Sequence, residues 1–397
     1  MEALVSVGDR YVGKAPAFEA DRPWWSEIED VTAQLEVLLG VPTFVLRLVQ
    51  ADSAESIRGG RVVYHVQAAA DPRPDALDPT PDPRWAEVIK PHPLRATWAE
   101  VDGPQRLADW ACGIVGAGTP TQVKTWNLSC LIRIPSAEGG AWAKATSPFC
   151  SVDAEIIQHV RRYDAALAPT VLGVDLENRW SLLAHAPGID CWEPDLPTVQ
   201  DVVSRWVSVQ ARIAVEELHI PKLLPADLPA ELDRLLAGEV GRQLSAEDLT
   251  RVRVLKEALP GLIEELESSG LPNTVVHGDF HPGNWRSDGT NRLIVDWADS
   301  YLGHPAADIQ RLRDWLPEEK KDVAIETWSS AWQRELPDSQ PLRALEPMTV
   351  IAQLLAAHTY QRFLDNIEPN ERIYHEGDPA EALRAASEAA VRAGSLD

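Results

Sequence analysis

The segment from residue 275 to residue 296 constrains the fold more strongly than any other part of this 397-residue chain. Apolar residues lead into His277 and Asp279, which predicts a short buried strand that ends in a polar loop. The Pro282-Gly283 pair prevents a helix from running through that loop. Two short runs on either side of a turn at residues 288–291 then predict a β-hairpin. The chain must therefore present a polar loop between a buried strand and a hairpin.

The hairpin turn, centred near Thr290, predicts that Asn284 and Asp296 face each other at the open end of the hairpin. Residues opposite one another across antiparallel strands have Cβ atoms ~5 Å apart. An amide oxygen and a carboxylate at that separation can share one hard cation, and Mg²⁺ prefers such ligands while it keeps substrate phosphates in its remaining positions. Asp279 is expected beside this ion, with its carboxylate free to orient a hydroxyl and accept its proton.

Three segments carry a resemblance to a known family: HGDFHPGN at residues 277–284, VDW at 295–297 and GHPAADI at 303–309. Together they resemble the aminoglycoside phosphotransferase family of small-molecule kinases, and the resemblance extends from about residue 122 to the C-terminus. The family implies an α+β, bilobal protein-kinase-like fold with a small β-rich N-lobe and a large, mostly helical C-lobe. It also implies ATP and Mg²⁺ in the cleft and the hydroxyl of a small molecule as phosphoryl acceptor.

The same resemblance implies roles for individual residues. Asp279 corresponds to the catalytic base, and Asn284 and Asp296 correspond to the Mg²⁺ ligands. His277, grouped with the catalytic residues, is expected to brace the loop. Asp308 is expected to tether the loop from the segment that follows.

The family also requires a strand lysine that binds the nucleotide phosphates and a helix carboxylate that holds this lysine. Lys144 is the candidate, because it lies among apolar neighbours on the second strand of a hairpin predicted around a turn at residues 137–140. A lysine without a function is costly to bury in such a strand. Glu155, on the following helix, is the expected partner of Lys144, and Asp153 is the rival for that role.

Two further nucleotide contacts are expected from the family. The turn that covers the phosphates is expected at residues 125–129, with Asn127 and Ser129 as contacts, although it contains no glycine. Adenine is expected to meet the backbone at His185 and Ala186, where a strand runs into a turn. Because the glycine is missing, GTP stays open as an alternative to ATP.

Sequence patterns predict three parts. Residues 1–115 form a small α+β domain of unassigned role, with a helix that opens at Trp24, strands at 43–49 and 61–66, and an exposed Asp/Pro-rich loop at 71–84. Residues 116–187 form the N-lobe, with a strand at 122–134 and a helix capped by Ser151. Residues 188–397 form the C-lobe, whose helices include one opened by a capping box at Ser245.

The acceptor site is expected between the helices after residue 202 and those at the C-terminus. Acidic and aromatic residues gather in the C-terminal part and are candidates for binding the amines of an aminoglycoside or amino sugar: Asp365, Glu368, Glu371, Glu376, Asp378, Tyr360, Tyr374 and His375. A solvated acidic face is the competing interpretation.

The charge balance limits the partners of the chain. The sequence has 37 Lys and Arg against 61 Asp and Glu, a net charge of −24, and nucleic acid is therefore not an expected partner. A cationic small molecule is compatible with that charge. No apolar run reaches about 18 residues and no basic leader opens the chain, so no membrane association is expected and the cytoplasm is the expected location.

Two alternative functions stay open at this point. The His277-x-Asp279-x-His281 spacing also occurs in metal-dependent hydrolases, which would bind Zn²⁺ or Mn²⁺ without a nucleotide and would have no use for Lys144 or Glu155. A non-catalytic kinase-like or sugar-binding module is suggested by the 15 tryptophans, whose rings can stack on ligands.

Overall fold

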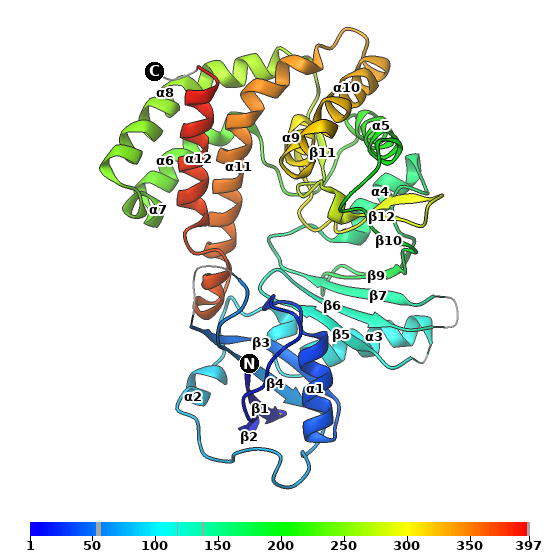
Figure 1. The fold of residues 1–397 in the computed structure, drawn as a ribbon, viewed down its shortest axis with the longest axis vertical. Helices are drawn as coiled ribbons and strands as arrows, with labels where there is room; N and C mark the ends of the chain where they lie inside the picture. The colour runs from blue at the N-terminus through cyan, green and yellow to red at the C-terminus, as the bar shows by residue number, and fades with distance from the viewer. Residues whose placement is uncertain (53–56, 117, 137–138, 395–397) are drawn as a thin grey trace. The chain divides into compact units, whose positions relative to one another are not determined.

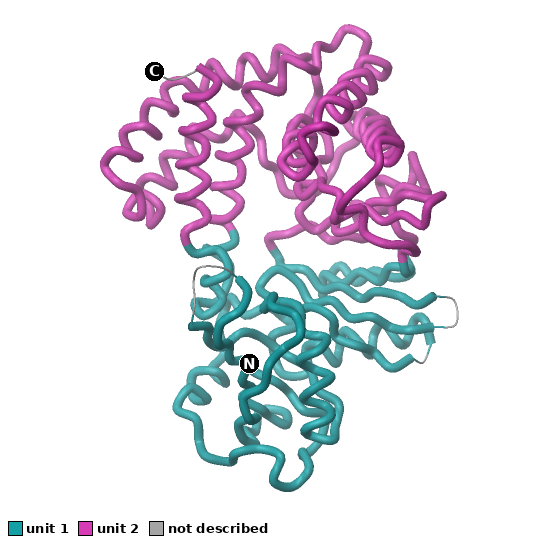
Figure 2. The backbone as a smooth tube through the Cα atoms, viewed as in Figure 1, with its two compact units in different colours: residues 1–148, 171–185, 363–376 teal, residues 149–170, 186–362, 377–397 magenta. Residues whose placement is uncertain are grey.

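The computed structural model describes residues 1–52, 57–116, 118–136 and 139–394 (Figure 1). The chain divides into two units, coloured separately in Figure 2. Unit 1 comprises Met1–Pro148, Val171–His185 and Phe363–Glu376, and unit 2 comprises Phe149–Thr170, Ala186–Arg362 and Gly377–Asp397. The boundaries of the three predicted parts, after residues 115 and 187, stay predictions.

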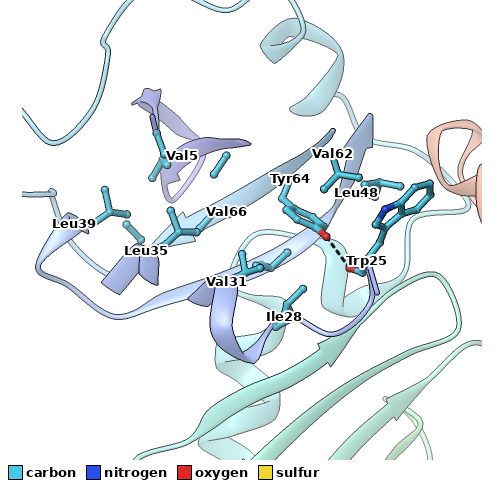
Figure 3. Packing of buried hydrophobic residues seen from close by; sticks show 14 of the residues in the cluster. Val5, Trp25, Ile28, Val31, Leu35, Leu39, Leu48, Val62, Tyr64 and Val66 are labelled. Atoms are coloured by element: carbon cyan, nitrogen blue, oxygen red, sulfur yellow. Dashed lines mark hydrogen bonds between the residues drawn. The ribbon is translucent and has the colours of Figure 1, made fainter. Parts of the chain in front are cut away.

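Unit 1 begins with a four-stranded sheet in the order β2-β1-β4-β3. Its central strands β1 and β4 are parallel, and the other pairs are antiparallel. The helix α1 supplies the apolar face of Val31 and Leu35, which packs with Tyr64 and Val66 of the sheet (Figure 3). The elements are β1 (Glu2–Val7), β2 (Arg10–Lys14), α1 (Glu29–Leu39), β3 (Thr43–Ala51) and β4 (Val62–Ala68).

The sequence expectations for this sheet are largely confirmed. The strands predicted at 43–49 and 61–66 are β3 and β4, and the predicted helix ends at Gly40. That helix begins at Glu29 and not at Trp24, because the preceding segment forms turns. In this segment the carbonyl of Trp25 accepts a hydrogen bond from the hydroxyl of Tyr64. The strands β1 and β2 were not predicted.

The second sheet of unit 1 has five antiparallel strands in the order β5-β6-β7-β9-β8. The helix α3 (Gly103–Val115) covers one face and shares a core with β6, β7 and β9. The predicted strand at 122–134 is wrong in one respect, since a turn at 126–128 divides it into two strands. In the predicted turn at 137–140, residues 137 and 138 lie outside the described part. The strands are β5 (Thr121–Thr125), β6 (Ser129–Ile134), β7 (Ala141–Thr146), β8 (Val171–Asp175) and β9 (Trp180–Ala184).

Short helices and the segment Phe363–Glu376 complete unit 1. The short elements are α2 (Trp85–Val88), η1 (Thr97–Ala99) and η5 (Pro369–Tyr374). Arg47 and Glu368, each with 4% of its side chain exposed, form an ion pair of 2.8 Å. Arg95 Nε donates to the same carboxylate at 2.9 Å. Tyr374 packs against Trp25 in the first core, with ring centroids 6.0 Å apart.

These contacts contradict part of the predicted acidic acceptor face. Glu368, Glu371 and Tyr374 are buried in unit 1, where Arg47 and apolar rings surround them. Burial, reinforced by the charge of Glu368, raises the pKa of Glu371 to about 8. None of these three side chains is therefore available to an amine in solution.

Unit 2 is mainly helical, because its segments place apolar residues at helical spacing on one face. Its helices are α4 (Asp153–Tyr163), α5 (Leu196–Ile213), α6 (Leu228–Ala237), α7 (Glu239–Gln243), α8 (Ala246–Glu267), α9 (Ala306–Trp315), α10 (Glu318–Glu335), α11 (Leu345–Asp365), whose last turn enters unit 1, and α12 (Asp378–Arg392). Short 3₁₀ turns are η2 (Pro225–Asp227), η3 (Pro282–Asn284) and η4 (Pro341–Ala344). Among the helices described, none is both long and apolar enough to cross a membrane.

Two predicted caps have different outcomes. At the start of α8, Asp248 N donates to Ser245 Oγ at 3.1 Å and Ser245 N donates to Asp248 Oδ2 at 3.2 Å, so the capping box is confirmed. Ser151 does not cap α4, because its hydroxyl donates to the carbonyl of Ser300 at 2.7 Å. The N-cap of α4 is Val152, which has no side-chain cap.

Five short strands in unit 2 carry the polar loop and its hairpin. β11 (Thr274–Val276) pairs with β14 (Tyr301–Gly303), and β12 (Trp285–Ser287) lies between β10 (Ile189–Asp190) and β13 (Arg292–Ile294). The predicted arrangement of buried strand, loop and hairpin is therefore present.

Candidate active site

The loop after β11 is held at its start by Asp308 of α9. Asp308 Oδ2 accepts hydrogen bonds from His277 N at 3.0 Å, Trp206 Nε1 at 2.8 Å and Gln210 Nε2 at 3.0 Å. Its Oδ1 accepts from Gly278 N at 3.2 Å. Burial raises the pKa of Asp308 to about 6, although these donors favour its charged form. Asp308 is thus the expected tether of the loop.

His277 braces the loop from inside. It is fully buried, and its Nδ1 accepts a hydrogen bond from Asp279 N at 3.3 Å. The proton of a neutral ring therefore lies on Nε2, which donates to Val295 O at 3.1 Å. Burial lowers the pKa of His277 to about 4, so the ring is neutral at pH 7. With both nitrogens engaged, His277 is a positioning residue that links the loop to the end of the hairpin.

Asp279 is not free, contrary to the sequence expectation. Its Oδ1 accepts two hydrogen bonds from Arg311, from Nε at 3.0 Å and Nη2 at 2.8 Å. Its Oδ2 accepts from His281 Nε2 at 3.2 Å and from Asn284 Nδ2 at 3.0 Å. Burial favours the neutral acid, but the hydrogen bond from His281 and the charge of Arg311 outweigh it and hold the pKa of Asp279 far below its usual range. Asp279 is therefore a fixed carboxylate anion.

The hairpin register differs by one residue from the prediction. β12 and β13 pair Trp285 with Ile294, and Val295 N donates to Asn284 O at 2.9 Å. Asn284 therefore lies opposite Val295 and not opposite Asp296. Asp296 has φ 64°, in the left-handed region, so regular pairing ends before it. Asn284 and Asp296, the proposed ligands, are therefore offset by one residue at the open end of the hairpin.

The orientation of Asn284 suits a hard cation. Its Nδ2 also donates to the carbonyl of Asp279 at 2.9 Å, which fixes the amide so that its Oδ1 faces away from Asp279. Among the described residues, no donor forms a hydrogen bond to this oxygen. Asp296 adds an exposed carboxylate beyond Val295. An amide oxygen and a carboxylate fit Mg²⁺, which prefers oxygen ligands.

Asp153 supports the segment after Asp296. Its Oδ1 accepts a hydrogen bond from Trp297 N at 2.9 Å, and Asp153 is almost fully buried. This bond engages one carboxylate oxygen of Asp153, so Asp153 and Glu155, which is half-buried on α4, both stay candidate partners of Lys144. Lys144 lies on β7, the central strand of its sheet, between Leu131 and Ser181, and is 7% exposed. Lys144 and Glu155 belong to different units, and their pairing stays a prediction.

The turn between β5 and β6 contains the other predicted phosphate contacts. Asn127 is 2% exposed, and neither its Oδ1 nor its Nδ2 has a hydrogen-bond partner among the described residues. Its carbonyl accepts from Ser147 Oγ at 2.7 Å. Ser129 Oγ accepts from Trp126 Nε1 at 3.2 Å. Asn127 thus has an unused amide in the turn, whereas Ser129 is engaged locally.

The predicted adenine segment crosses the boundary of the units. His185, the last residue of that part of unit 1, accepts a hydrogen bond on Nδ1 from Trp142 Nε1 at 3.0 Å. The carbonyl of Ala186 accepts from Arg286 Nε at 3.2 Å. Arg286, which lies on β12, also donates a hydrogen bond to Asp190 at 2.7 Å. Arg286 therefore holds the segment from Ala186 to Asp190 against β12.

Three residues beside Asp279 and His281 were not predicted: Arg311, Trp192 and Trp315. The rings of His281, Trp192 and Trp315 form a cluster with centroids 4.8, 5.3 and 5.5 Å apart. The Arg311 guanidinium lies 5.3 Å from the ring centroid of Trp315. One signal was present in the sequence: Asp308 and Arg311 are three residues apart on α9, and that spacing directs both towards the same loop.

The geometry argues against the hydrolase alternative. Both nitrogens of His277 are engaged in protein hydrogen bonds, so this residue has no lone pair for a metal. Within the described residues, no group of three or more His, Cys, Asp or Glu side chains is arranged to hold a metal ion.

Comparison with known proteins gives a family and a fold. A family model described as "Phosphotransferase enzyme family" matches residues 138–345, more than half of the chain. No curated protein sequence matches the chain. Choline kinase LicA from Streptococcus pneumoniae is 12% identical, with a TM-score of 0.52 over 72% of this chain and 99% of that chain. A Plasmodium vivax ethanolamine kinase is 11% identical, with a TM-score of 0.52 over 72% of this chain and 88% of that chain.

Aminoglycoside phosphotransferase APH(4)-Ia is 16% identical, with a TM-score of 0.48 over 73% of this chain and 99% of that chain. The two kinases with the higher TM-scores confirm the predicted α+β, protein-kinase-like fold.

Proposed function

This chain belongs to the phosphotransferase enzyme family and is a small-molecule kinase, and from that premise we propose that ATP is its phosphoryl donor and Asp279 its catalytic base. The supporting observation is the double hydrogen bond from Asn284 Nδ2 to the carbonyl and carboxylate of Asp279, at 2.9 and 3.0 Å. One amide thereby orients Asp279 and leaves its own oxygen available to a metal ion.

The reaction transfers the γ-phosphoryl group to an acceptor hydroxyl. A bond forms between the acceptor oxygen and the γ-phosphorus, the bond from that phosphorus to the bridging oxygen breaks, and ADP leaves. Asp279 orients the hydroxyl and takes its proton, which then passes to solvent. Because Asp279 is held as an anion, its contribution is mainly positioning and electrostatic attraction, which suits phosphoryl transfer.

Other residues bind the donor in this proposal. Asn284 and Asp296 hold Mg²⁺, which when bound neutralises the charge of the phosphates. Lys144, held by Glu155, binds the phosphates from β7, and the free amide of Asn127 donates to them from the turn next to Ser129. The backbone at His185 and Ala186 binds the adenine. The acceptor is a small molecule with a hydroxyl group.

The test compares Asp279→Asn with a matched control, Asp338→Asn, which makes the same chemical change at an exposed position after α10. ADP release is measured with Mg²⁺ and ATP, with and without hydroxyl acceptors. We expect Asp279→Asn to lower kcat by orders of magnitude and to retain the thermal shift that Mg²⁺ and ATP produce. Unchanged turnover in Asp279→Asn would refute the assignment of the base.

The proposed metal ligands have a separate test. Asp296→Asn is expected to weaken the dependence of the ATP thermal shift on Mg²⁺, since a neutral amide replaces a charged ligand. If the Mg²⁺ concentration that gives half the shift is the same as in the wild-type protein, Asp296 is not a ligand.

A further inference from the structure

The carboxylate of Asp279 has no unused site for a substrate hydroxyl in this structure. A carboxylate offers about four lone-pair positions. Arg311 occupies two of them, and His281 and Asn284 occupy the others. An acceptor hydroxyl that forms a hydrogen bond to Asp279 must therefore displace one of these donors.

Arg311 is the donor that can leave without a change in the backbone. Asn284 and His281 belong to the same loop as Asp279, and His281 Nδ1 is fixed by Gly283 N at 3.0 Å. Arg311 instead reaches the loop from α9, and 39% of its side chain is exposed. Its guanidinium lies over the ring of Trp315, so it can turn away from Asp279 while it remains beside the site.

The two indoles next to this site are exposed and held in place. Trp192 is 53% exposed and Trp315 is 44% exposed, more than any other tryptophan described. The ring of Trp192 lies so close to Gly283 that a Cβ there would be 2.3 Å from it. Cys191 N donates to the carbonyls of Pro282 and Trp285, which fixes the neighbouring backbone on the loop. Large apolar rings that remain exposed and ordered beside a reactive group are typical of a binding surface.

We propose that Trp192, Trp315 and Arg311 form the acceptor subsite of the kinase and that they bind a sugar ring with neighbouring hydroxyl groups. This inference rests on the proposed function, because it places the acceptor next to Asp279. The apolar C–H face of the ring stacks on the indoles. One hydroxyl donates to Asp279, and the oxygen of its neighbour accepts from the displaced Arg311.

The charge of the subsite favours a hydroxyl over an amine at that neighbouring position. An ammonium group has no lone pair to accept from Arg311, and it meets the positive charge of the guanidinium. This proposal differs from the sequence-based expectation of a cationic acceptor, which stays a prediction. An enzyme selective for amines would instead use Asp299 and Asp378, whose charges act on Tyr360 together with those of Arg311 and Asp279.

The first experiment compares neutral and amino sugars as acceptors for the full-length protein. The probes are glucose and maltose, with glucosamine as the matched amine and kanamycin as a polyamine. We expect ATP-dependent phosphorylation of a neutral sugar, with kcat/KM about tenfold or more above that of the amines. If no neutral sugar is phosphorylated, or if turnover is confined to the amines, the proposal is wrong. Acceptor-free ATP hydrolysis that is lost in Asp279→Asn would in that case still support the kinase assignment.

The second experiment tests the residues through substrate preference. Trp192→Ala and Trp315→Ala are expected to raise KM for the sugar about tenfold, because each indole buries part of the sugar's ring face. Trp315→Phe is expected to retain part of the affinity, because the phenyl ring still covers part of that face. KM for ATP is expected to stay within about twofold, which separates this effect from a general loss of structure. Arg311→Gln is expected to raise the ratio of kcat/KM for glucosamine over glucose by about tenfold.

A matched control is available in unit 1. Trp24, 39% exposed, lies 5.3 Å from the Arg58 guanidinium, the same cation–π distance as in the Trp315 and Arg311 pair. Trp24→Ala should leave KM for both substrates unchanged. If Trp192→Ala and Trp315→Ala behave like this control, the indoles do not bind the acceptor and the proposal is refuted.

Discussion

The substitution Glu371→Gln isolates the energetic cost of one buried carboxyl group. Burial, together with the neighbouring charge of Glu368, raises the pKa of Glu371 to about 8 from the ordinary value of 4.5. A carboxyl whose pKa is higher in the folded than in the unfolded protein lowers the free energy of unfolding as the pH rises between the two values. Below the unfolded pKa the group costs nothing, and above the folded pKa the full cost is present.

The size of the effect follows from the pKa difference. Each pKa unit corresponds to about 1.4 kcal/mol. The buried carboxyl therefore costs about 2 kcal/mol at pH 6 and about 5 kcal/mol at pH 9. Glutamine has nearly the same shape and no titration, so the free energy of unfolding of Glu371→Gln relative to wild type should rise by about 3 kcal/mol between pH 6 and pH 9.

The assay is urea unfolding followed by tryptophan fluorescence, at pH 6 and pH 9, for wild type, Glu371→Gln and Glu376→Gln. Glu376 is in the same segment and exposed, so its substitution controls for the change in overall charge. We expect the pH-dependent difference only for Glu371→Gln. Equal pH dependence in all three proteins would show that the charge of Glu371 is not penalised by burial and would refute its burial near Glu368.

Three further substitutions test other parts of the structure. Gly188→Ala should lower Tm, at a cost of more than about 1 kcal/mol, since a Cβ at φ 88° would lie 1.9 Å from Ser287 O; an unchanged Tm would contradict that close approach. Asp308→Ala leaves four buried donors without their acceptor, at about 1–3 kcal/mol each, and should abolish turnover and lower soluble yield; wild-type values for both would rule out the tether. Ser245→Ala should destabilise α8 by about 1 kcal/mol in calorimetry, and no change would mean that the capping box contributes nothing.

Local interactions made the loop and hairpin predictable. The order of buried strand, polar loop and hairpin depends on residues within about 20 positions of one another, and the Pro282-Gly283 pair limits the backbone directly. The register was wrong by one residue, because Ser287 pairs with Arg292 across the turn and thereby places Asn284 opposite Val295, and the sequence does not fix at which residues the pairing next to the turn begins.

Long-range contacts could not be predicted in the same way. Glu368 was expected on an acidic surface, but its carboxylate is paired with Arg47, which is 321 residues away in the chain. The charged and aromatic residues of the segment Phe363–Glu376 are compatible both with an exposed acidic face and with a buried ion pair. Only the packing of the segment into unit 1 distinguishes the two.

The sequence by itself predicted which residues take part in phosphoryl transfer, because the chemistry restricts residue types and short spacings within one loop. Only the tertiary structure decided what surrounds Asp279, since Arg311 and Trp315 on α9 and Trp192 before α5 reach Asp279 or His281 from outside the loop. Contacts between distant segments depend on how the elements pack, and the spacing of apolar residues shows which face of an element is buried but not which other segment that face meets.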